Sequence, residues 1–297
     1  MRDNVEDLAV SVIIPVWNDP QRLRLCLEAL DMQTLERDRF EVIVADNGST
    51  DNTVEVARSF PGVKIVIEPQ KGSYAARNSG AREARGKVIA FTDADCIPSP
   101  QWLENGLKYL AENPDTGVLA GEVTLFAPAT GARRVCVNYE KMFELRQRSN
   151  VERWGMAVTA NIMCSREVFT NLGGFDQKLL STGDAEFTRR AVAGGHALIY
   201  VEGVEVRHPI RGALKEVVSK HVRVQGGVWD RWLPTPKLMT LYVFAARCAA
   251  GRSLKAIYSQ EFSFLEKVEL LAFINFLFAA SLYEYTRRSL GFAARRR

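Results

Sequence analysis

The sequence predicts an α/β protein with a mostly parallel sheet flanked by helices, and three observations support this fold class. Short apolar runs alternate with stretches of helical periodicity over residues 9–95. Parallel neighbours need a crossover between them, so this alternation indicates βαβ units. A chain of 297 residues, of which 47% are hydrophobic, is also long and apolar enough to bury a large core.

The elements follow one another regularly in the first third of the chain and less regularly afterwards. In the helix predicted at 20–33, Leu23, Leu27 and Leu30 recur at helical spacing. From residue 212 onward the sequence is helix-like, with a break at LPTP (233–236). Strands are predicted at 9–16, 40–48, 63–69, 87–95, 117–126 and near 197–206. Helices are predicted at 20–33, 51–60, 73–84, 100–112, around 136–148 and at 184–194.

Charge is unevenly distributed along the chain. Residues 1–211 contain 25 basic and 29 acidic residues, a net charge of −4, whereas residues 212–297 contain 14 basic and 6 acidic residues, a net charge of +8. A basic segment can bind nucleic acid or an anionic membrane surface. The sequence has no RNA- or DNA-binding motif, so no nucleic-acid partner is expected.

The beginning of the chain and its cysteines indicate the compartment. The segment MRDNVEDLAV carries acids and has neither the basic nor the apolar region of a secretory signal. Five well-separated cysteines form no C-x-x-C motif, so reduced thiols are expected rather than disulfides or a zinc site. These features predict a cytoplasmic protein.

Two acids end the apolar run in FTDADCIPSP (91–100). Asp93 and Asp95 would repel each other if packed side by side without a counter-charge. Ligands of parallel sheets bind beyond the carboxyl ends of the strands, and Mg²⁺ or Mn²⁺ is commonly held there by one or two carboxylates together with substrate phosphates. The pair therefore predicts a divalent cation and a phosphate-bearing ligand. The alternative is an ordinary solvated turn before Pro98.

Two further features are predicted at the same sheet edge. Asp46 ends the strand at 40–48 and could accept hydrogen bonds from a base or a ribose, or could simply cap the turn ADNGSTD. Arg77 and Asn78 belong to a helix that begins just after Lys71 and Gly72, a position suited to a phosphate. Surface arginines are common, so Arg77 alone is weak support for such a site.

Taken together and in this order, seven segments resemble the inverting family 2 glycosyltransferases, which have the GT-A fold. The resemblance covers roughly residues 9–210. It implies a nucleotide-sugar donor, a divalent metal at the D-x-D motif and inversion at the anomeric carbon. The segments are SVIIPVWN, VADNGSTD, GSYAARNSG, FTDADC, ANIMCSREVF, LGGFD and GDAEFTRR.

The resemblance assigns donor-binding residues. Pro15, Trp17 and Asp46 would line the nucleobase pocket, with Asp46 as the partner of a uracil-like imide, which favours a UDP-sugar. Arg77 would approach the donor.

The metal site also follows from the resemblance. The segment Asp93-Ala94-Asp95 would bind the donor, with Asp93 at the ribose or metal and Asp95 at the metal and the diphosphate. His208 matches a histidine that many GT-A enzymes use as a further metal or phosphate contact; otherwise it is a surface or core-edge residue. The cofactor would be Mn²⁺ or Mg²⁺.

An inverting transfer also needs a base for the acceptor hydroxyl. Asp184 matches the catalytic carboxylate of the family, and Glu186 matches the second acid that commonly follows. The sequence departs from the family pattern at Gly183, where a glutamate is usual. Alternatively, Asp184 only caps the helix that follows it.

The loop on the acceptor side is implied to contain Gly174, Phe175 and Asp176, preceded by Gly173, although a Gly-Gly pair is also ordinary turn chemistry. The acceptor would be a glycan or a lipid-linked molecule in cell-surface polysaccharide or glycolipid biosynthesis.

The expected organisation is a catalytic domain at 1–211 and a basic helical extension at 212–297. In the extension, the uncharged stretch 270–283 is shorter than the roughly 20 residues that span a bilayer. It predicts a helix buried against the catalytic domain or a second subunit, so a homo-oligomer is one expectation. The rival is an interfacial helix in peripheral contact with the inner face of the membrane.

Two other functions compete with the glycosyltransferase prediction. A nucleotidyltransferase also binds a nucleotide and Mg²⁺ on an α/β sheet. A non-catalytic nucleotide-sugar-binding protein would explain Gly183 as the mark of a decayed active site.

Overall fold

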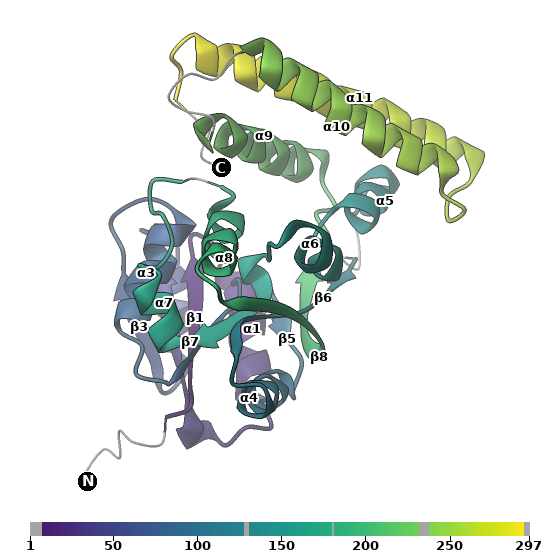
Figure 1. Ribbon diagram of the computed structural model, residues 1–297. Helices are drawn as coiled ribbons and strands as arrows, with labels where there is room; N and C mark the ends of the chain where they lie inside the picture. The colour runs from purple at the N-terminus through teal and green to yellow at the C-terminus, as the bar shows by residue number, and fades with distance from the viewer. Residues whose placement is uncertain (1–7, 128–130, 180, 232–237, 294–297) are drawn as a thin grey trace. The chain divides into compact units, whose positions relative to one another are not determined.

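The computed structural model describes residues 8–127, 131–179, 181–231 and 238–293, and their contacts divide the chain into two units (Figure 1). The first unit, the sheet unit, runs to Leu125 and also contains Leu145–Lys178 and Gly183–Pro209. The second, the helical unit, contains Phe126–Glu144, Leu179–Thr182 and the chain from Ile210 onward. The sheet unit thus collects most residues of the predicted site.

Eight strands form one mixed sheet in the described residues, in the order β3-β2-β1-β4-β7-β6-β8-β5. The β3-β2-β1-β4 half is parallel, whereas β7 runs antiparallel to β4 and to β6, and β5 antiparallel to β8. The predicted α/β class with a mixed sheet is confirmed. The strands are β1 (Val10–Val16), β2 (Phe40–Asp46), β3 (Val63–Ile67), β4 (Val88–Phe91), β5 (Ile97–Pro98), β6 (Thr116–Phe126), β7 (Ile162–Ser165) and β8 (Ala197–Pro209).

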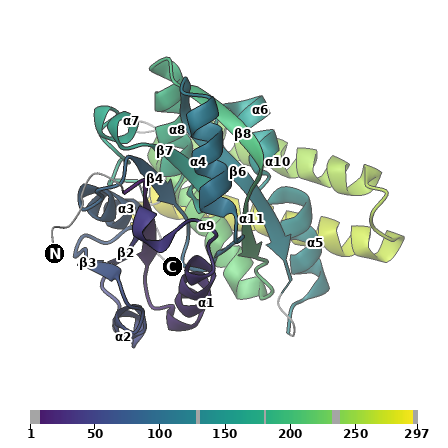
Figure 2. The same ribbon diagram turned by 90° about the horizontal axis from the view of Figure 1, so that it is seen from below.

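Helices cover the parallel half, and every residue of β2 is buried. Side chains of β1 and β2 pack with α1 and α2, which lie next to each other in Figure 2. Pro20 begins α1 and the Asp19 side chain accepts a hydrogen bond from the Arg22 amide, so the helix start is set locally. The helices of this unit are α1 (Pro20–Asp31), α2 (Thr53–Arg58), α3 (Ser73–Arg82), α4 (Trp102–Glu112), α6 (Gln147–Trp154), α7 (Arg166–Asn171) and α8 (Gly183–Ala193), with 3₁₀ turns at Arg37–Arg39 and Thr159–Asn161.

Helix α3 approaches the sheet closely because Gly80 faces β1. A Cβ atom at Gly80 would lie 2.7 Å from the Ile13 Cγ2 atom. The absence of a side chain therefore brings the backbone of α3, and with it Arg77, close to the carboxyl ends of the parallel strands.

Several element boundaries differ from the predictions. Strand β4 ends at Phe91, four residues early, because the chain turns at 93–95. The helix predicted around 136–148 is two helices, separated where Leu145 has a φ of 44°. Strand β7 was not predicted, since four residues are too few for a periodicity signal.

The helical unit contains the apolar stretch 270–283, which packs on other helices of the same unit. Leu270, Phe273, Ile274 and Leu277 lie in a core shared with α5 and α9. Ser263 and Glu266 form a capping box that begins α11. The helices are α5 (Arg134–Phe143), α9 (Leu214–Arg231), α10 (Leu238–Tyr258) and α11 (Phe264–Ser289). Among the described residues, none of the helices combines the length and apolarity that crossing a bilayer requires.

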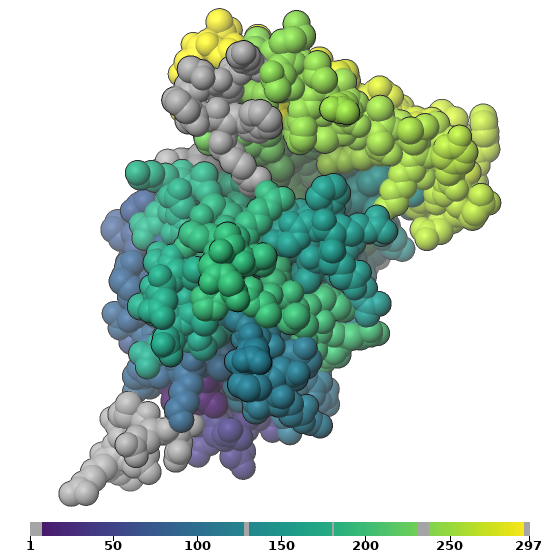
Figure 3. Space-filling model, viewed as in Figure 1, coloured from purple at the N-terminus to yellow at the C-terminus, as the bar shows by residue number. Residues whose placement is uncertain are grey.

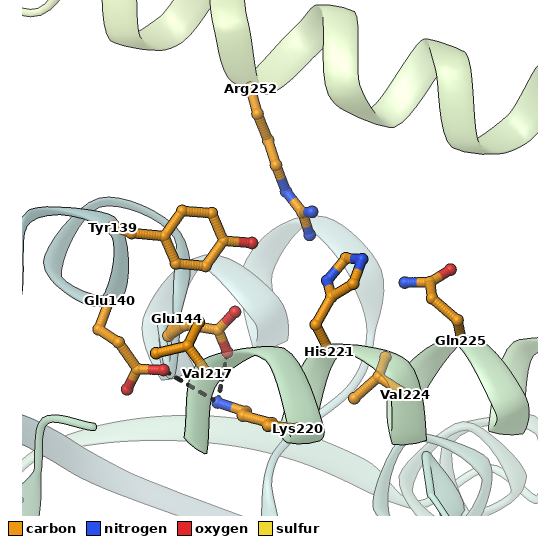
Figure 4. A pocket seen from close by; sticks show the side chains of 9 residues that line it. All are labelled: Tyr139, Glu140, Glu144, Val217, Lys220, His221, Val224, Gln225 and Arg252. Carbon is orange, nitrogen blue, oxygen red and sulfur yellow. Dashed lines mark hydrogen bonds and ion pairs between the residues drawn. The ribbon is translucent and has the colours of Figure 1, made fainter. Parts of the chain in front are cut away.

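Charged groups are buried between these helices. Figure 4 shows the Lys220 ammonium between the carboxylates of Glu140 and Glu144. Burial acts to raise the pKa of Glu144, but Lys220, Arg252 and Arg211 outweigh it and lower the pKa to about 2. Glu144 is therefore charged at neutral pH and joins helices α5 and α9.

Candidate active site

The acidic residues predicted at the sheet edge lie where two parallel strands end. Asp46 is the last residue of β2, and Asp93 follows β4 by two residues. Both strands pair in parallel with β1, so their carboxyl ends meet at one edge of the sheet. A shared crevice at this edge was the basis of the sequence prediction.

A group of potential metal ligands forms at this edge. Ligand atoms of Asp93, Asp95, Cys96 and His208 all lie within 4.8 Å of one another. Strand β8 brings His208 to this position, with Nε2 3.7 Å from Asp95 Oδ1. Its Nδ1 lies 2.8 Å from the Pro209 carbonyl oxygen. Because a carbonyl only accepts, Nδ1 carries the proton, and in the neutral ring Nε2 has a lone pair available for a cation.

The oxygen and nitrogen donors of this group fit a divalent cation. Hard cations such as Mg²⁺ and Mn²⁺ prefer carboxylate oxygens, which Asp93 and Asp95 provide. Cys96 is less suitable, since burial, followed by the charges of Asp95 and Asp93, keeps the pKa of its thiol well above the usual range. The two acids and His208 are therefore the ligands that this site offers a hard cation.

Arg77 is buried beside the acids. Its side chain is 5% exposed, and its guanidinium forms an ion pair with Asp93 Oδ1. The Nε atom is buried without a hydrogen-bond partner among the described residues. A buried cation next to the carboxylates is suited to an additional negative charge, such as a phosphate.

Asp46 has one carboxylate oxygen in the turn and one without a partner. Oδ2 accepts hydrogen bonds of 3.0 Å from the amides of Gly48 and Ser49, so the turn-capping alternative describes this oxygen. Oδ1 is buried and has no hydrogen-bond partner among the described residues. An unsatisfied buried acceptor is costly, so Oδ1 is available for an N–H donor of a ligand.

Pro15 and Trp17, the other two residues predicted for the nucleobase pocket, lie near Asp46 in the structure. Asn47, which the sequence analysis did not single out, lies next to Asp46. Pro15 pairs with Ala45 in the sheet, and Trp17 directly follows β1 with 40% of its surface exposed. The Asn47 side chain accepts a hydrogen bond from the Gly72 amide and donates to the carbonyl of Gln70. It ties the turn after β2 to the start of α3. The feature of the sequence that could have identified Asn47 is its position next to Asp46 in the polar turn ADNGSTD.

Asp184 lies at the start of α8, near Arg77 and Asp93. Its Oδ1 atom accepts hydrogen bonds from the Ala185 amide at 2.9 Å and from the Tyr74 hydroxyl at 3.4 Å. Burial raises the pKa of Asp184 and Asp93 adds to the rise, whereas the Ala185 amide and Arg77 act to lower it. A carboxylate with a raised pKa is a stronger base than an exposed one.

Glu186 has a different environment from Asp184. Arg190 binds both of its oxygens, at 2.7 and 2.8 Å, one helical turn away. The same guanidinium donates to the carbonyls of Leu172 and Gly174. Glu186 is thus engaged in holding the Gly-Gly loop, which leaves Asp184 as the better placed acid; Arg190 was not predicted.

The loop that is predicted to lie on the acceptor side is hydrogen-bonded to α3. The Asn78 side chain donates to the Phe175 carbonyl at 2.8 Å and accepts from the Phe175 amide at 2.9 Å. Gly174, with a φ of 69°, has no room for a Cβ atom beside Asn78. Phe175 is buried in an aromatic cluster, whereas Gly173 and Asp176 are exposed. The aromatic rings around Phe175 are those of Tyr74, Phe91, Phe169 and Phe187.

Comparison with known proteins identifies the family. Residues 11–173 match the family described as Glycosyl transferase family 2, which is more than half of the chain. The chain belongs to glycosyl transferase family 2. The predicted family and the assignment as a glycosyltransferase enzyme are confirmed.

Curated relatives of this family 2 glycosyltransferase support the assignment. It is 36% identical over 231 residues to "Glycosyltransferase AglE" of Haloferax volcanii, covering 75% of this chain and 74% of that protein. It is 29% identical over 208 residues to "Probable glycosyltransferase YdaM" of Bacillus subtilis, covering 66% of this chain and 49% of that one.

Solved structures confirm the GT-A fold of this glycosyltransferase. The mannosyltransferase PcManGT from Pyrobaculum calidifontis, in complex with GDP-Man and Mn²⁺, has a TM-score of 0.58 and 21% identity, covering 95% of this chain and 74% of that one. TarS residues 1–349 from S. aureus, in complex with UDP, has a TM-score of 0.54 and 15% identity, covering 97% and 93%. The helical C-terminal region lies within these coverages.

Proposed function

We propose that this family 2 glycosyltransferase is metal-dependent and inverting, and that it moves a sugar from a nucleotide-sugar donor to a hydroxyl acceptor. The observation that carries the proposal is the cluster of Asp93, Asp95 and His208 beside the buried Arg77. A site for Mn²⁺ or Mg²⁺ next to a buried arginine suits a diphosphate. The structural relative PcManGT, in complex with GDP-Man and Mn²⁺, supports this choice of ligands.

The nucleobase would bind at Asp46, between Pro15 and Trp17. Uracil and guanine both present a ring N–H, which Asp46 Oδ1 can accept. Relatives in complex with GDP-Man and with UDP make both bases reasonable. We favour a UDP-sugar, because the family resemblance assigns Asp46 as the partner of a uracil-like imide.

The chain's own residues would carry out the remaining steps. Arg77 and the Asp93-Ala94-Asp95 segment would orient the diphosphate, and a bound divalent cation would supply Lewis-acid stabilisation of the leaving group. Asp184 would take the proton of the acceptor hydroxyl as the acceptor oxygen bonds to the anomeric carbon, and the bond from that carbon to the nucleoside diphosphate would break on the opposite face of the sugar. Gly174 and Asp176 would lie on the acceptor side. The catalytic domain would be residues 1–211.

A donor screen tests this function. The purified protein is incubated with UDP-, GDP- and dTDP-sugars and Mn²⁺, and consumption of each donor is followed by mass spectrometry. We expect consumption of one nucleotide class, UDP-sugars first, that stops when EDTA removes the metal. Release of pyrophosphate from a nucleoside triphosphate would instead indicate a nucleotidyltransferase. Calorimetric binding of nucleoside diphosphates without turnover of any donor would indicate a non-catalytic binding protein.

For the extension at 212–297 we propose peripheral contact with an anionic membrane, which would place the enzyme at the inner face and suit a lipid-linked acceptor in polysaccharide or glycolipid biosynthesis. The turn between α10 and α11 lies at one end of the helical unit (Figures 1 and 3). Tyr258 and Phe264 flank this turn and are 75% and 84% exposed. The +8 charge of residues 212–297 complements anionic lipids. Other exposed apolar residues here are Leu254, Ile257, Leu265 and Val268.

Vesicle sedimentation tests this contact. We expect the protein to sediment with phosphatidylglycerol vesicles but much less with phosphatidylcholine vesicles. The double substitution Tyr258→Ser and Phe264→Ser is expected to weaken sedimentation about tenfold or more, because it removes exposed apolar area. Met32→Ser is the matched control, since Met32 is 71% exposed in the sheet unit. Failure to sediment, together with a dimer in light scattering that the double variant loses, would assign the surface to a homo-oligomer instead.

A further inference from the structure

The hydroxyl of Tyr74, a residue of α3, forms a hydrogen bond with the Asp184 carboxylate. Tyr74 lies in the first turn of α3 and is 5% exposed. Its hydroxyl is 3.4 Å from Asp184 Oδ1. The residue before Asp184 touches the same ring: a Cβ atom at Gly183 would lie 2.7 Å from Cε2 and 2.9 Å from Cδ2 and Cζ of Tyr74. The ring thus occupies the space that a side chain at position 183 would need.

The ring of Tyr74 is held by neighbours that belong to the site. The Arg77 guanidinium carbon lies 5.7 Å from the ring centroid, and the Phe175 ring centroid lies at 5.6 Å. Arg77 in turn binds Asp93. A buried ring with these contacts has little freedom, so the position of its hydroxyl is set by the fold rather than by solvent.

The two oxygens of the Asp184 carboxylate differ in the hydrogen bonds that they accept. Oδ1 receives the Ala185 amide and the Tyr74 hydroxyl. Two donors hold Oδ1 in place and so set the plane of the carboxylate. Among the described residues no hydrogen bond is made to the other oxygen, Oδ2, which can therefore accept a proton from an acceptor hydroxyl. Orientation of this kind is what a general base requires before it can act.

We propose that Tyr74 is a positioning residue for Asp184, donating its hydroxyl hydrogen to Oδ1, and that position 183 is glycine because the Tyr74 ring fills that space. The inference rests on the proposed function, in which Asp184 is the base. It also gives the departure at Gly183 a physical reason other than decay of the site.

The protonation state of Tyr74 agrees with this role. Burial, followed by the charge of Asp184, raises the pKa of the phenol above its usual value, so the hydroxyl keeps its proton. A phenol that donates to a carboxylate stabilises the charged form and therefore acts to lower the pKa of Asp184. The other charged groups that act on Asp184 are Arg77, which lowers its pKa, and Asp93, which raises it.

The first test is Tyr74→Phe, which keeps the ring and removes the hydroxyl. We expect kcat to fall about tenfold, the size of effect that loss of one hydrogen bond produces, with little change in KM for the donor. We also expect the acidic limb of the kcat profile to move to higher pH, because the pKa of Asp184 rises without its donor. Tyr139→Phe is the control: it removes a buried hydroxyl that has no partner among the described residues, and should change neither quantity.

The second test moves the ring without removing the hydroxyl. Gly183→Ala places a Cβ atom against Tyr74, so we expect a lower melting temperature and the same upward shift of the acidic limb. In a Tyr74→Ala background the same substitution should cost much less stability, because the clash is gone.

The outcomes separate this inference from the proposed function. An inactive Asp184→Asn variant together with wild-type kcat and pH profile in Tyr74→Phe would overturn the role of Tyr74 and leave the function standing. Full activity of Asp184→Asn would overturn the base assignment itself. Equal costs of Gly183→Ala in the two backgrounds would contradict the steric explanation of Gly183.

Discussion

Asp184→Asn is expected to abolish sugar transfer while leaving donor binding largely intact. The amide keeps the shape of the carboxylate but cannot take a proton from the acceptor hydroxyl. General-base contributions are typically about 10²- to 10⁴-fold, so kcat should fall by about that factor. Asp184 contacts Tyr74 and the Ala185 amide rather than the metal ligands, which is why donor affinity should survive.

The measurement pairs initial rates with calorimetry of a nucleoside diphosphate and Mn²⁺. Asp115→Asn, at an exposed aspartate between α4 and β6, is the control and should behave as wild type. Glu186→Gln should have a smaller effect than Asp184→Asn, because Arg190 already binds the Glu186 carboxylate. Wild-type transfer by Asp184→Asn would rule out this residue as the base.

Asp95→Asn is expected to abolish transfer by removing metal-dependent donor binding. Asp95 contributes one of the two carboxylates of the cluster and lies 3.7 Å from His208 Nε2. Loss of that charge weakens the hold on a hard cation, and we expect kcat/KM to fall about 10³-fold or more, since the metal contributes several kcal/mol to leaving-group stabilisation. Unlike Asp184→Asn, this variant should show little heat of donor binding in the presence of Mn²⁺.

Thermal unfolding gives an independent measure of the metal site. Mn²⁺ and a nucleoside diphosphate should raise the melting temperature of the wild type and of Asp115→Asn, since a ligand that binds only the folded state stabilises it. The rise should be largely absent in Asp95→Asn. An undiminished Mn²⁺-dependent rise in Asp95→Asn would contradict the ligand assignment.

Local sequence patterns were sufficient to predict most strands in the parallel half of the sheet. In β1, β2 and β4 apolar runs of strand length alternate with periodic helices, and this signal depends only on neighbours along the chain. The order of the seven motifs was sufficient to predict the family, because each motif is a run of contiguous residues that can be recognised without knowing the fold. The antiparallel half was harder: β7 has four residues, and its pairing with β4 and β6 is a long-range choice that no local period encodes.

The sequence by itself therefore determined the fold class, the family and the acids at the ends of β2 and β4, since these depend on contiguous residues. Tertiary structure alone decided which distant side chains share an environment. It placed His208, which the resemblance had assigned to the metal, beside Asp95, brought Arg190 to the carbonyls of Leu172 and Gly174, and set the Tyr74 ring where a side chain at 183 would have been. The physical reason is that these contacts arise from packing between segments far apart in the chain, and packing is decided by the volume and hydrogen-bonding capacity of all the surrounding side chains together.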